Sequence, residues 1–373
     1  MKILPFETER WFARYEFTCR HMLASSDCES LTIGELLELA GVEPGVFLGT
    51  RLGYGDGAGG LSLRAAIAGT YEGVEADDVI VLGAPQEGIF LLLHALLEPG
   101  DGAVVVTPCY DSLRNLVRHV GAEVHPWEIA EEGEGWRLDL DALEASLAEH
   151  RPRLLILNFP HNPTGHQPDL EGLDRILSLA RAAGVQVFCD EMYRGLALAP
   201  VTNLPSAVER DKGAIVLGGM SKSYGLPGLR CGWLVVRDAA LRDRILDWKH
   251  YTTICPTRAT EALAEIAVGV REALFSRHCA QIASNLTSAL AFFGALDGFT
   301  CRPPLAGSVA LVRTPWRDAQ ARCQELAESH GVLLLPGACL GAGPEFVRIG
   351  LGRAGFEAGL EALGRALRSR APA

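Results

Sequence analysis

The amino-acid sequence predicts an α/β fold: a mostly parallel seven-stranded sheet sandwiched by helices, with a smaller α+β domain formed by the two chain ends. Between about residues 78 and 236, short apolar and β-branched runs alternate with amphipathic helical stretches, a pattern typical of parallel strands joined by helices. Residues 238–295 have a helical pattern, and the sequence beyond them alternates again. With 373 residues, 48% of them hydrophobic, the chain can bury more than one core.

We expect three segments along the chain. Residues 1–45 form an N-terminal arm or lid that joins the small domain, residues 46–255 the large domain, and residues 256–373 the small C-terminal domain. The arm contains the polar patch SSDCES at 25–30, followed by a short helical run. Ser26 or Ser30 is either a cap of that helix or part of a polar lid over a substrate.

Seven apolar runs are the expected strands. They are VIVL (79–82), AVVV (103–106), EVHPW (123–127), LLILN (154–158), VQVFCD (185–190), AIVLGG (214–219) and CGWLVV (231–236). Strands buried on both faces have such continuous apolar runs. Ligands of these sheets bind beyond the carboxyl ends of the strands, and several polar residues of this sequence stand directly after the runs.

The charge balance limits the classes of partner. The formal net charge is −12 and no Lys/Arg cluster stands out, which disfavours nucleic acid or an anionic membrane as the main partner. No apolar run approaches the roughly 18 residues of a membrane span, and the charged N-terminus does not resemble a signal peptide. The ten cysteines are scattered without a CxxC, so we expect free thiols in a reducing cytoplasm, no disulfide framework and no metal site.

Two glycine-containing loops could approach a ligand closely. The loop at 51–69, RLGYGDGAGGLSLRAAIAG, contains Tyr54 near its start, and its glycines permit tight turns. The loop GAPQEG at 83–88 lies between a strand and a helix, where helix-start amides can bind a phosphate. Pro85 has no N–H, so Gln86 and Glu87 are the expected donors.

Three further strand-end loops carry distinct side chains. TPCYDS (107–112) presents Tyr110, an aromatic residue that can stack on a flat ring. NFPHNPTG (158–165) presents Asn162, and CDEMYRG (189–195) presents Asp190 with Tyr193. Each residue also has a structural explanation, as a turn, a core residue or a helix cap. Their succession behind the strands of one domain favours a common binding site.

The stretch GGMSKSYGLPGLRCGW at 218–233 completes this set. It places Lys222 between small residues and Arg230 eight positions later. A lysine whose pKa is lowered by burial can form a Schiff base with a carbonyl compound. A guanidinium group suits the planar geometry of phosphate or carboxylate oxygens.

With these motifs, the chain resembles the pyridoxal-phosphate (PLP) enzymes of the aspartate aminotransferase superfamily, the class I and II aminotransferases of fold type I. HNPTG, DEMY and SKSYGLPGLRCGW carry the resemblance, which covers essentially the whole length. It implies that Lys222 holds PLP as a Schiff base and that the reaction passes through aldimine and quinonoid intermediates. It further implies that Asp190 contacts the pyridine nitrogen, and that Tyr193 and Asn162 contact the 3′-oxygen of the ring.

The resemblance also implies roles for residues around the ring. Tyr110 matches the stacking aromatic residue and Arg230 the phosphate-binding arginine. Tyr54 resembles a tyrosine that reaches the phosphate of a neighbouring subunit, which implies a homodimer with a shared site. Arg348, in EFVRIGLG, matches the arginine that binds the substrate α-carboxylate.

Two positions depart from the family pattern at the phosphate. Gly219 replaces a serine that usually stands three positions before the lysine, and Pro85 stands where an amide is common. Ser221, or Thr252 or Thr253 of a partner chain, could compensate for the lost contacts.

The motifs specify the cofactor better than the reaction. An aminotransferase acting on an L-amino acid and a 2-oxo acid is the first hypothesis. The second is a cyclase or lyase, because NFPHNPTG, SKSYGLPGLRCGW and YTTICPT (251–257) also resemble capreomycidine synthase and its relatives, which cyclise hydroxylated arginine. Asp27 or Glu29 would then pair with a guanidinium. A ligand-sensing regulator is disfavoured because no basic helix-turn-helix segment is present.

Overall fold

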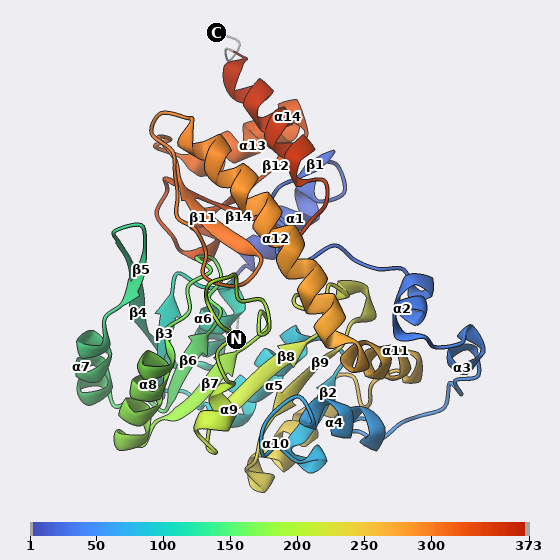
Figure 1. The fold of residues 1–373 in the computed structure, drawn as a ribbon. Helices are drawn as coiled ribbons and strands as arrows, with labels where there is room; N and C mark the ends of the chain where they lie inside the picture. The colour runs from blue at the N-terminus through green and yellow to red at the C-terminus, as the bar shows by residue number, and fades with distance from the viewer. Residues whose placement is uncertain (1–2, 370–373) are drawn as a thin grey trace.

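The computed structural model describes residues 3–369 and is built around one eight-stranded sheet (Figure 1). The strand order is β2-β9-β8-β7-β6-β3-β4-β5. The strands are β2 (Val79–Leu82), β3 (Gly102–Thr107), β4 (Glu123–Glu132), β5 (Gly135–Leu138), β6 (Leu154–Asn158), β7 (Gln186–Asp190), β8 (Ile215–Gly219) and β9 (Gly232–Val235). The pairs from β8 through β4 are parallel, whereas β9 runs antiparallel to both β2 and β8. The α/β fold with a mostly parallel sheet is therefore confirmed.

The sheet has one strand more than the seven that the sequence predicted. All seven predicted runs form strands, and the additional strand β5 pairs antiparallel with β4 at the edge. Its sequence, GWRL, is short and follows the acidic turn around Gly133, which has a φ of 55°. A short half-exposed edge strand lacks the apolar run by which the central strands were found.

Alternate residues of each central strand contact different helical layers. Val104 and Leu155 pack with α4 (Leu61–Ala68), α7 (Leu140–His150), α8 (Leu170–Ala182), α9 (Ala207–Arg210) and α11 (Arg258–Gly269). Val105 and Ile156 pack with α5 (Pro85–Leu96), α6 (Asp111–Val120) and α10 (Ala239–Lys249). The period of two along a strand thus gives a three-layer sandwich.

A second hydrophobic cluster forms a smaller lobe, which lies above the large sheet in Figure 1. Its four-stranded antiparallel sheet has the order β10 (Thr300–Cys301), β11 (Val309–Arg313), β14 (Phe346–Gly350) and β13 (Leu335–Pro336). The helices α13 (Ala319–His330) and α14 (Phe356–Arg368) pack in this lobe. The short 3-10 helices of the chain as a whole are η1 (Ala76–Asp78), η2 (Pro227–Leu229) and η3 (Gly337–Leu340).

The N-terminal residues pack mainly on this small lobe. Trp11 of α1 (Glu7–Tyr15) donates its Nε1–H to the Leu334 carbonyl at 2.9 Å, and β1 (His21–Met22) pairs with β12 (Val332–Leu333). Further along, α2 (Ile33–Ala40) buries Leu36 and Leu37 in a cluster of the large lobe, and α3 (Pro44–Leu48) follows. The limits 1–45, 46–255 and 256–373 stay a prediction.

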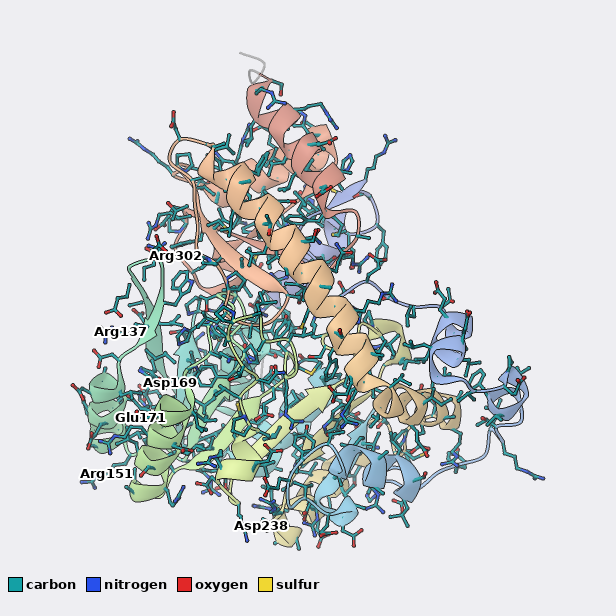
Figure 2. The ribbon with its side chains drawn as sticks, viewed as in Figure 1. Arg137, Arg151, Asp169, Glu171, Asp238 and Arg302 are labelled. Carbon is teal, nitrogen blue, oxygen red and sulfur yellow. The ribbon has the colours of Figure 1, made fainter. Side chains whose placement is uncertain are left out.

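The two lobes are also joined by a helix and by an ionic cluster. Helix α12 (Arg271–Gly294) runs from one lobe to the other (Figure 1), with Leu274 in the large-lobe cluster and Phe293 in the small-lobe cluster. On the opposite side, Glu131 of β4 binds Arg302 and Arg313 of the small lobe. Figure 2 shows Arg302 near the tip of the β4–β5 hairpin.

Over the range 3–369, no helix is both long and apolar enough to cross a membrane.

Candidate active site

The carboxyl ends of the parallel strands and the small lobe enclose a cavity of about 500 Å³. Ten of the residues proposed from the sequence line it: Asp27, Gln86, Tyr110, Asn162, Asp190, Tyr193, Ser221, Lys222, Arg230 and Arg348. The position agrees with the rule that ligands bind beyond the carboxyl ends of parallel strands.

Lys222 lies in the turn that follows β8, with its side chain directed into this cavity. Its Nζ donates a hydrogen bond to the Ser26 hydroxyl at 2.7 Å. Burial lowers the pKa of Lys222, while the negative charge of Asp27 acts in the opposite direction. A lowered pKa increases the share of the neutral amine, which is the nucleophilic form.

Asp190 ends β7 and is buried, with 6% of its surface exposed. Its Oδ1 accepts a hydrogen bond from the Met192 amide at 3.1 Å. Burial raises the pKa of Asp190 to about 6, and the Met192 amide and Lys222 partly oppose this effect. Asp190 is therefore a buried carboxyl group whose ionised form is stabilised by a nearby positive charge.

Asn158 fixes the ends of two neighbouring strands. Its Nδ2 donates to the Asp190 carbonyl at 2.9 Å, and its Oδ1 accepts from the Asn162 amide at 2.8 Å. Asn158 is the last residue of β6, opposite Asp190 in the parallel register. A single side chain thus connects the two loops that carry Asp190 and Asn162.

Arg348 is a buried cation in the middle of β14. It is 1% exposed, and its two terminal nitrogens donate to Asn162 Oδ1 at 3.1 Å and to the Ala24 carbonyl at 2.9 Å. Within residues 3–369 it has no carboxylate partner, and its Nε has no hydrogen bond. Burial lowers the pKa of Arg348. An unpaired buried guanidinium is costly, so the site is suited to an anion.

Tyr193 and Tyr110 add two phenol groups to the walls. The Tyr193 hydroxyl is buried and makes no well-aligned hydrogen bond within residues 3–369, and burial raises its pKa, while Arg348 and the nearby Ser26 hydroxyl act in the opposite direction. The Tyr110 hydroxyl donates to Glu9 Oε1 at 2.7 Å. Burial and, after it, Glu9 raise the pKa of Tyr110. Both phenols remain protonated at neutral pH and can donate hydrogen bonds.

Arg230, Ser221 and Gln86 also line the cavity. Arg230 is exposed, has a left-handed φ of 51°, and donates from Nη1 to the Pro227 carbonyl at 3.1 Å. The Gln86 Oε1 atom is buried without a hydrogen-bond partner in the described part of the chain. These residues thus offer a guanidinium, a hydroxyl and an amide to a ligand.

The two departures at Pro85 and Gly219 are in contact with each other. Pro85 starts α5, and a Cβ atom added at Gly219 would lie 2.5 Å from Pro85 Cγ. A Cβ atom added at Gly232 would lie 2.7 Å from Pro85 N. The proline therefore fits into a slot between two glycines, and a serine at position 219 would collide with it.

Three proposed residues do not line the cavity. The Tyr54 side chain is 93% exposed. The Glu29 carboxylate accepts from the Ala354 amide at 2.9 Å. The Glu87 carboxylate accepts from the Gly83 amide at 2.7 Å and from the hydroxyls of Thr252 and Thr253 of its own chain. The contacts with Gly83, Thr252 and Thr253 explain the position of the Glu87 carboxylate without a phosphate.

Asp27 lines the cavity but already has a guanidinium partner. Its two carboxylate oxygens accept hydrogen bonds from Arg353 at 3.0 and 2.7 Å. Neither Ser26 nor Ser30 caps the following helix, because Thr32 is the N-cap of α2 and accepts from the Glu35 amide. Of the two readings of this patch, the helix cap is wrong, and Ser26 lies over the site.

The sequence analysis missed Glu9 and Glu16, which also line the cavity. Phe12 follows Glu9 by three residues and Glu16 follows Phe12 by four. The three side chains therefore lie on one face of α1, with Glu16 at its C-cap. This spacing is visible in the sequence. What the sequence lacks is any indication that this face is turned toward Lys222 rather than toward solvent.

The residues of this cavity fit pyridoxal phosphate. A neutral lysine amine suits the aldehyde, a buried carboxylate suits the pyridinium, and Arg230 with Ser221 suits the phosphate. The unpaired Tyr193 hydroxyl and Gln86 oxygen are the polar atoms that a buried polar ligand would satisfy.

Comparison with known proteins agrees with this geometry. The chain is 32% identical to capreomycidine synthase of Streptomyces vinaceus over 97% of this chain and 94% of that protein. A PLP-dependent aminotransferase from Streptococcus suis has a TM-score of 0.92 at 28% identity, with 100% of both chains covered. The PLP-dependent cyclase OrfR has a TM-score of 0.90 at 30% identity, covering 100% of this chain and 99% of that chain.

The sequence model of the aminotransferase class I and II family matches residues 47–366, most of the length of the protein. Since that match includes the strand-end residues around the cavity, the chain belongs to the class I and II aminotransferases and is a PLP-dependent enzyme.

Proposed function

We propose that this enzyme transfers the α-amino group between an L-amino acid and a 2-oxo acid. The observation that carries the proposal is the placement of Lys222, Asp190 and the unpaired Arg348 around one cavity. A cofactor aldehyde, a pyridinium and a substrate carboxylate each have a complementary group there. Membership of the aminotransferase family supports the same reaction.

When bound, PLP supplies the electron sink for bonds broken at the substrate α-carbon. Asp190 holds the pyridinium by ionic contact, since a positive charge beside this buried carboxylate lowers its pKa from about 6. Tyr193 and Asn162 would hold the 3′-oxygen by hydrogen bonds, and Tyr110 would stack on the ring. Arg230, Ser221 and the backbone amide of Gln86 would hold the phosphate, whereas the Glu87 amide donates to the Ala84 carbonyl at 3.1 Å.

Arg348 binds the substrate carboxylate. Its planar guanidinium is fixed by Asn162 and the Ala24 carbonyl, so it is oriented before a substrate enters. An incoming carboxylate provides the missing counter-charge, and charge-assisted hydrogen bonds of this kind are roughly twice as strong as neutral ones. The α-carbon is thereby placed toward Lys222.

Lys222 moves the proton of the reaction. Burial lowers its pKa, which increases the share of free amine that can act as a base. The amine would accept the proton from the substrate α-carbon and hold it at Nζ.

We further propose a homodimer in the cytoplasm. Exposed large side chains gather in two loop regions, with Leu48 78%, Leu52 83% and Tyr54 93% exposed in one and Tyr251 90% exposed in the other. A partner subunit would cover them, and Tyr54 of one subunit would reach the phosphate of the other. Light scattering should give twice the chain mass, and an active monomer contradicts this proposal. A reducing compartment is consistent with ten free thiols.

A cyclase or lyase acting on a cationic amino acid is the second candidate. Glu9, Glu16 and Asp27 place three carboxylates on the wall of the cavity. Within the described chain, Glu16 has no hydrogen-bond or ion-pair partner for its side chain, and burial raises its pKa with Asp27 adding to the effect. A guanidinium or ammonium group would satisfy it. The relatedness to capreomycidine synthase supports the same class of substrate.

A product analysis separates the two candidates. The holoenzyme is incubated with L-aspartate, L-alanine, L-arginine and 3-hydroxy-L-arginine, each with and without 2-oxoglutarate, and the products are identified by mass. Transamination requires the oxo acid and yields glutamate. Loss of water or ammonia without the oxo acid indicates the cyclase or lyase. A protein that does not become yellow with PLP contradicts both.

A further inference from the structure

The amine of Lys222 meets a hydroxyl group from a distant part of the chain. The Nζ to Ser26 Oγ distance is 2.7 Å, and 196 positions separate the two residues. Lys222 follows β8 of the large lobe, whereas Ser26 belongs to the segment that connects β1 to α2. The contact therefore joins the nucleophile to the N-terminal segment.

Residues 23–29 of that segment are fixed by the small lobe on several sides. The Ser308 hydroxyl donates to the Ser26 carbonyl at 2.7 Å, and Arg348 donates to the Ala24 carbonyl at 2.9 Å. Close backbone packing adds to this, because a Cβ atom at Gly350 would lie 1.5 Å from the Ser25 carbonyl oxygen. The Ser26 hydroxyl is thus presented from a rigid support.

We propose that Ser26 is a positioning residue for Lys222, which holds the free amine by one N–H and leaves its lone pair directed into the cavity. This inference rests on the proposed function, in which Lys222 is the base. A neutral amine has two N–H groups and one lone pair, so an acceptor at 2.7 Å removes much of its rotational freedom.

The proton balance of the step is simple. The C–H bond at the α-carbon breaks and a new N–H bond forms at the lone pair of Lys222, while the electron pair of the C–H bond is left to the electron sink that PLP would supply. Ser26 neither gains nor loses a proton, but it accepts a stronger hydrogen bond once the amine has become an ammonium group. Ser26 therefore stabilises the charged form of Lys222 and raises the pKa that burial lowers.

The two lobes meet at the reacting atom through this contact. Arg348 of β14 is tied to the segment that carries Ser26, because it donates a hydrogen bond to the carbonyl of Ala24. Arg348, which binds the substrate carboxylate, and Ser26, which orients the amine, are therefore held at a fixed distance and orientation to each other. A substrate bound to Arg348 finds the amine already oriented.

The test uses Ser26→Ala and, as the conservative variant, Ser26→Thr in the full-length chain. PLP is removed from each purified protein and added back over a series of pH values, and the rate at which the visible absorbance returns is recorded. The midpoint of this rate against pH reports the ionisation of Lys222. We expect it to move down by about half a pH unit or more in Ser26→Ala, and to return in Ser26→Thr.

Ser308→Ala is the matched control for a merely structural effect. It removes the support of the Ser26 backbone but leaves the hydroxyl, so it should lower the melting temperature with little change of the midpoint. Equal midpoints for wild type and a folded Ser26→Ala, or equal shifts for Ser26→Ala and Ser308→Ala, overturn the inference. A wild type that forms no imine absorbance with PLP refutes the proposed function instead.

Discussion

Pro85 and Gly219 occupy complementary space at the cofactor end of the site. The pyrrolidine ring of Pro85 fills the volume that a side chain at position 219 would need, with a separation of 2.5 Å to an added Cβ atom. The two departures from the family pattern are therefore one structural change. A serine at position 219 would collide with the ring, so Pro85 requires a glycine at that position.

The contact predicts strong coupling between substitutions. Gly219→Ser alone should destabilise the protein by about 1–3 kcal/mol through overpacking, whereas Gly219→Ser in a Pro85→Ala background should be nearly neutral. Urea unfolding of the wild type, both single variants and the double variant gives the interaction energy. Additive effects of the two substitutions would show that the ring and position 219 are independent.

Lys222 should be the residue that borohydride reduction links to PLP. Reduction of the yellow holoenzyme followed by peptide mapping should place the label on Lys222, and Lys222→Ala should stay colourless. Lys249 is an internal comparison, since it is fully buried and donates to the Ile254 carbonyl at 3.3 Å. Lys212→Ala, a change at an exposed lysine, should label like the wild type. A label on Lys249 or Lys212 would show that another lysine binds the aldehyde and would contradict our proposal.

Asp190→Asn should retain PLP but lose about a hundredfold or more in turnover, because an amide cannot keep the pyridine nitrogen protonated. Measured turnover close to that of the wild type would refute this role of Asp190.

The pH dependence of stability gives a separate test of Asp190. Burial raises its pKa from 3.8 to about 6 in the protein without cofactor. A raised carboxyl pKa stabilises the fold below about pH 4, and this contribution is lost as the pH rises through 6. Relative to Asp190→Asn, the wild type should lose about 2–3 kcal/mol of unfolding free energy between pH 4 and 7. Parallel pH curves for the two proteins in urea unfolding would contradict the raised pKa.

Arg348→Lys should weaken the binding of amino acids by about tenfold to a hundredfold, because a lysine cannot replace two directed N–H donors. The dissociation constants follow from the change in cofactor absorbance on titration with L-alanine. Ethylamine has no carboxylate and serves as the control, since its affinity should be the same in both proteins. A loss of equal size for ethylamine would indicate general damage to the site.

Glu16→Gln tests the carboxylates on the cavity wall. It should reduce the preference for L-arginine over its neutral isostere L-citrulline by about five- to tenfold. Glu7→Gln is the matched control, because Glu7 is on the same helix but outside the cavity and lies 4.0 Å from Arg10. The preference is read from dissociation constants. If the wild type shows no such preference, the cationic-substrate candidate is wrong.

Much of the fold and the cavity could be predicted from the sequence because strand ends have local signals. Apolar runs located seven of the eight strands of the large sheet, and the residues that follow the parallel strands converge because those strands end at one edge. Arg348 lies on a strand of the small lobe and was found only through family resemblance. Nothing local indicates that β14 faces the large sheet.

The contributions of the N-terminal segment could not be predicted, because they depend on contacts between distant residues. The position of α1 is set by Trp11 binding the Leu334 carbonyl and by a cluster of side chains from the C-terminal third. Only this packing turns Glu9 and Glu16 toward Lys222. Asp27 was predicted as a substrate ligand, but the sequence offers no sign that Arg353 occupies both of its oxygens.

We expect the two lobes to unfold in one cooperative transition because helix α12 packs in both of them. Its 24 residues form one uninterrupted helix whose beginning packs in the large-lobe cluster and whose end packs in the small-lobe cluster. Unfolding of either cluster removes the packing from half of the helix and exposes buried apolar surface of the other half. Calorimetry should therefore give one transition rather than two. Any ligand of the large lobe should raise the melting temperature of the small lobe by the same amount.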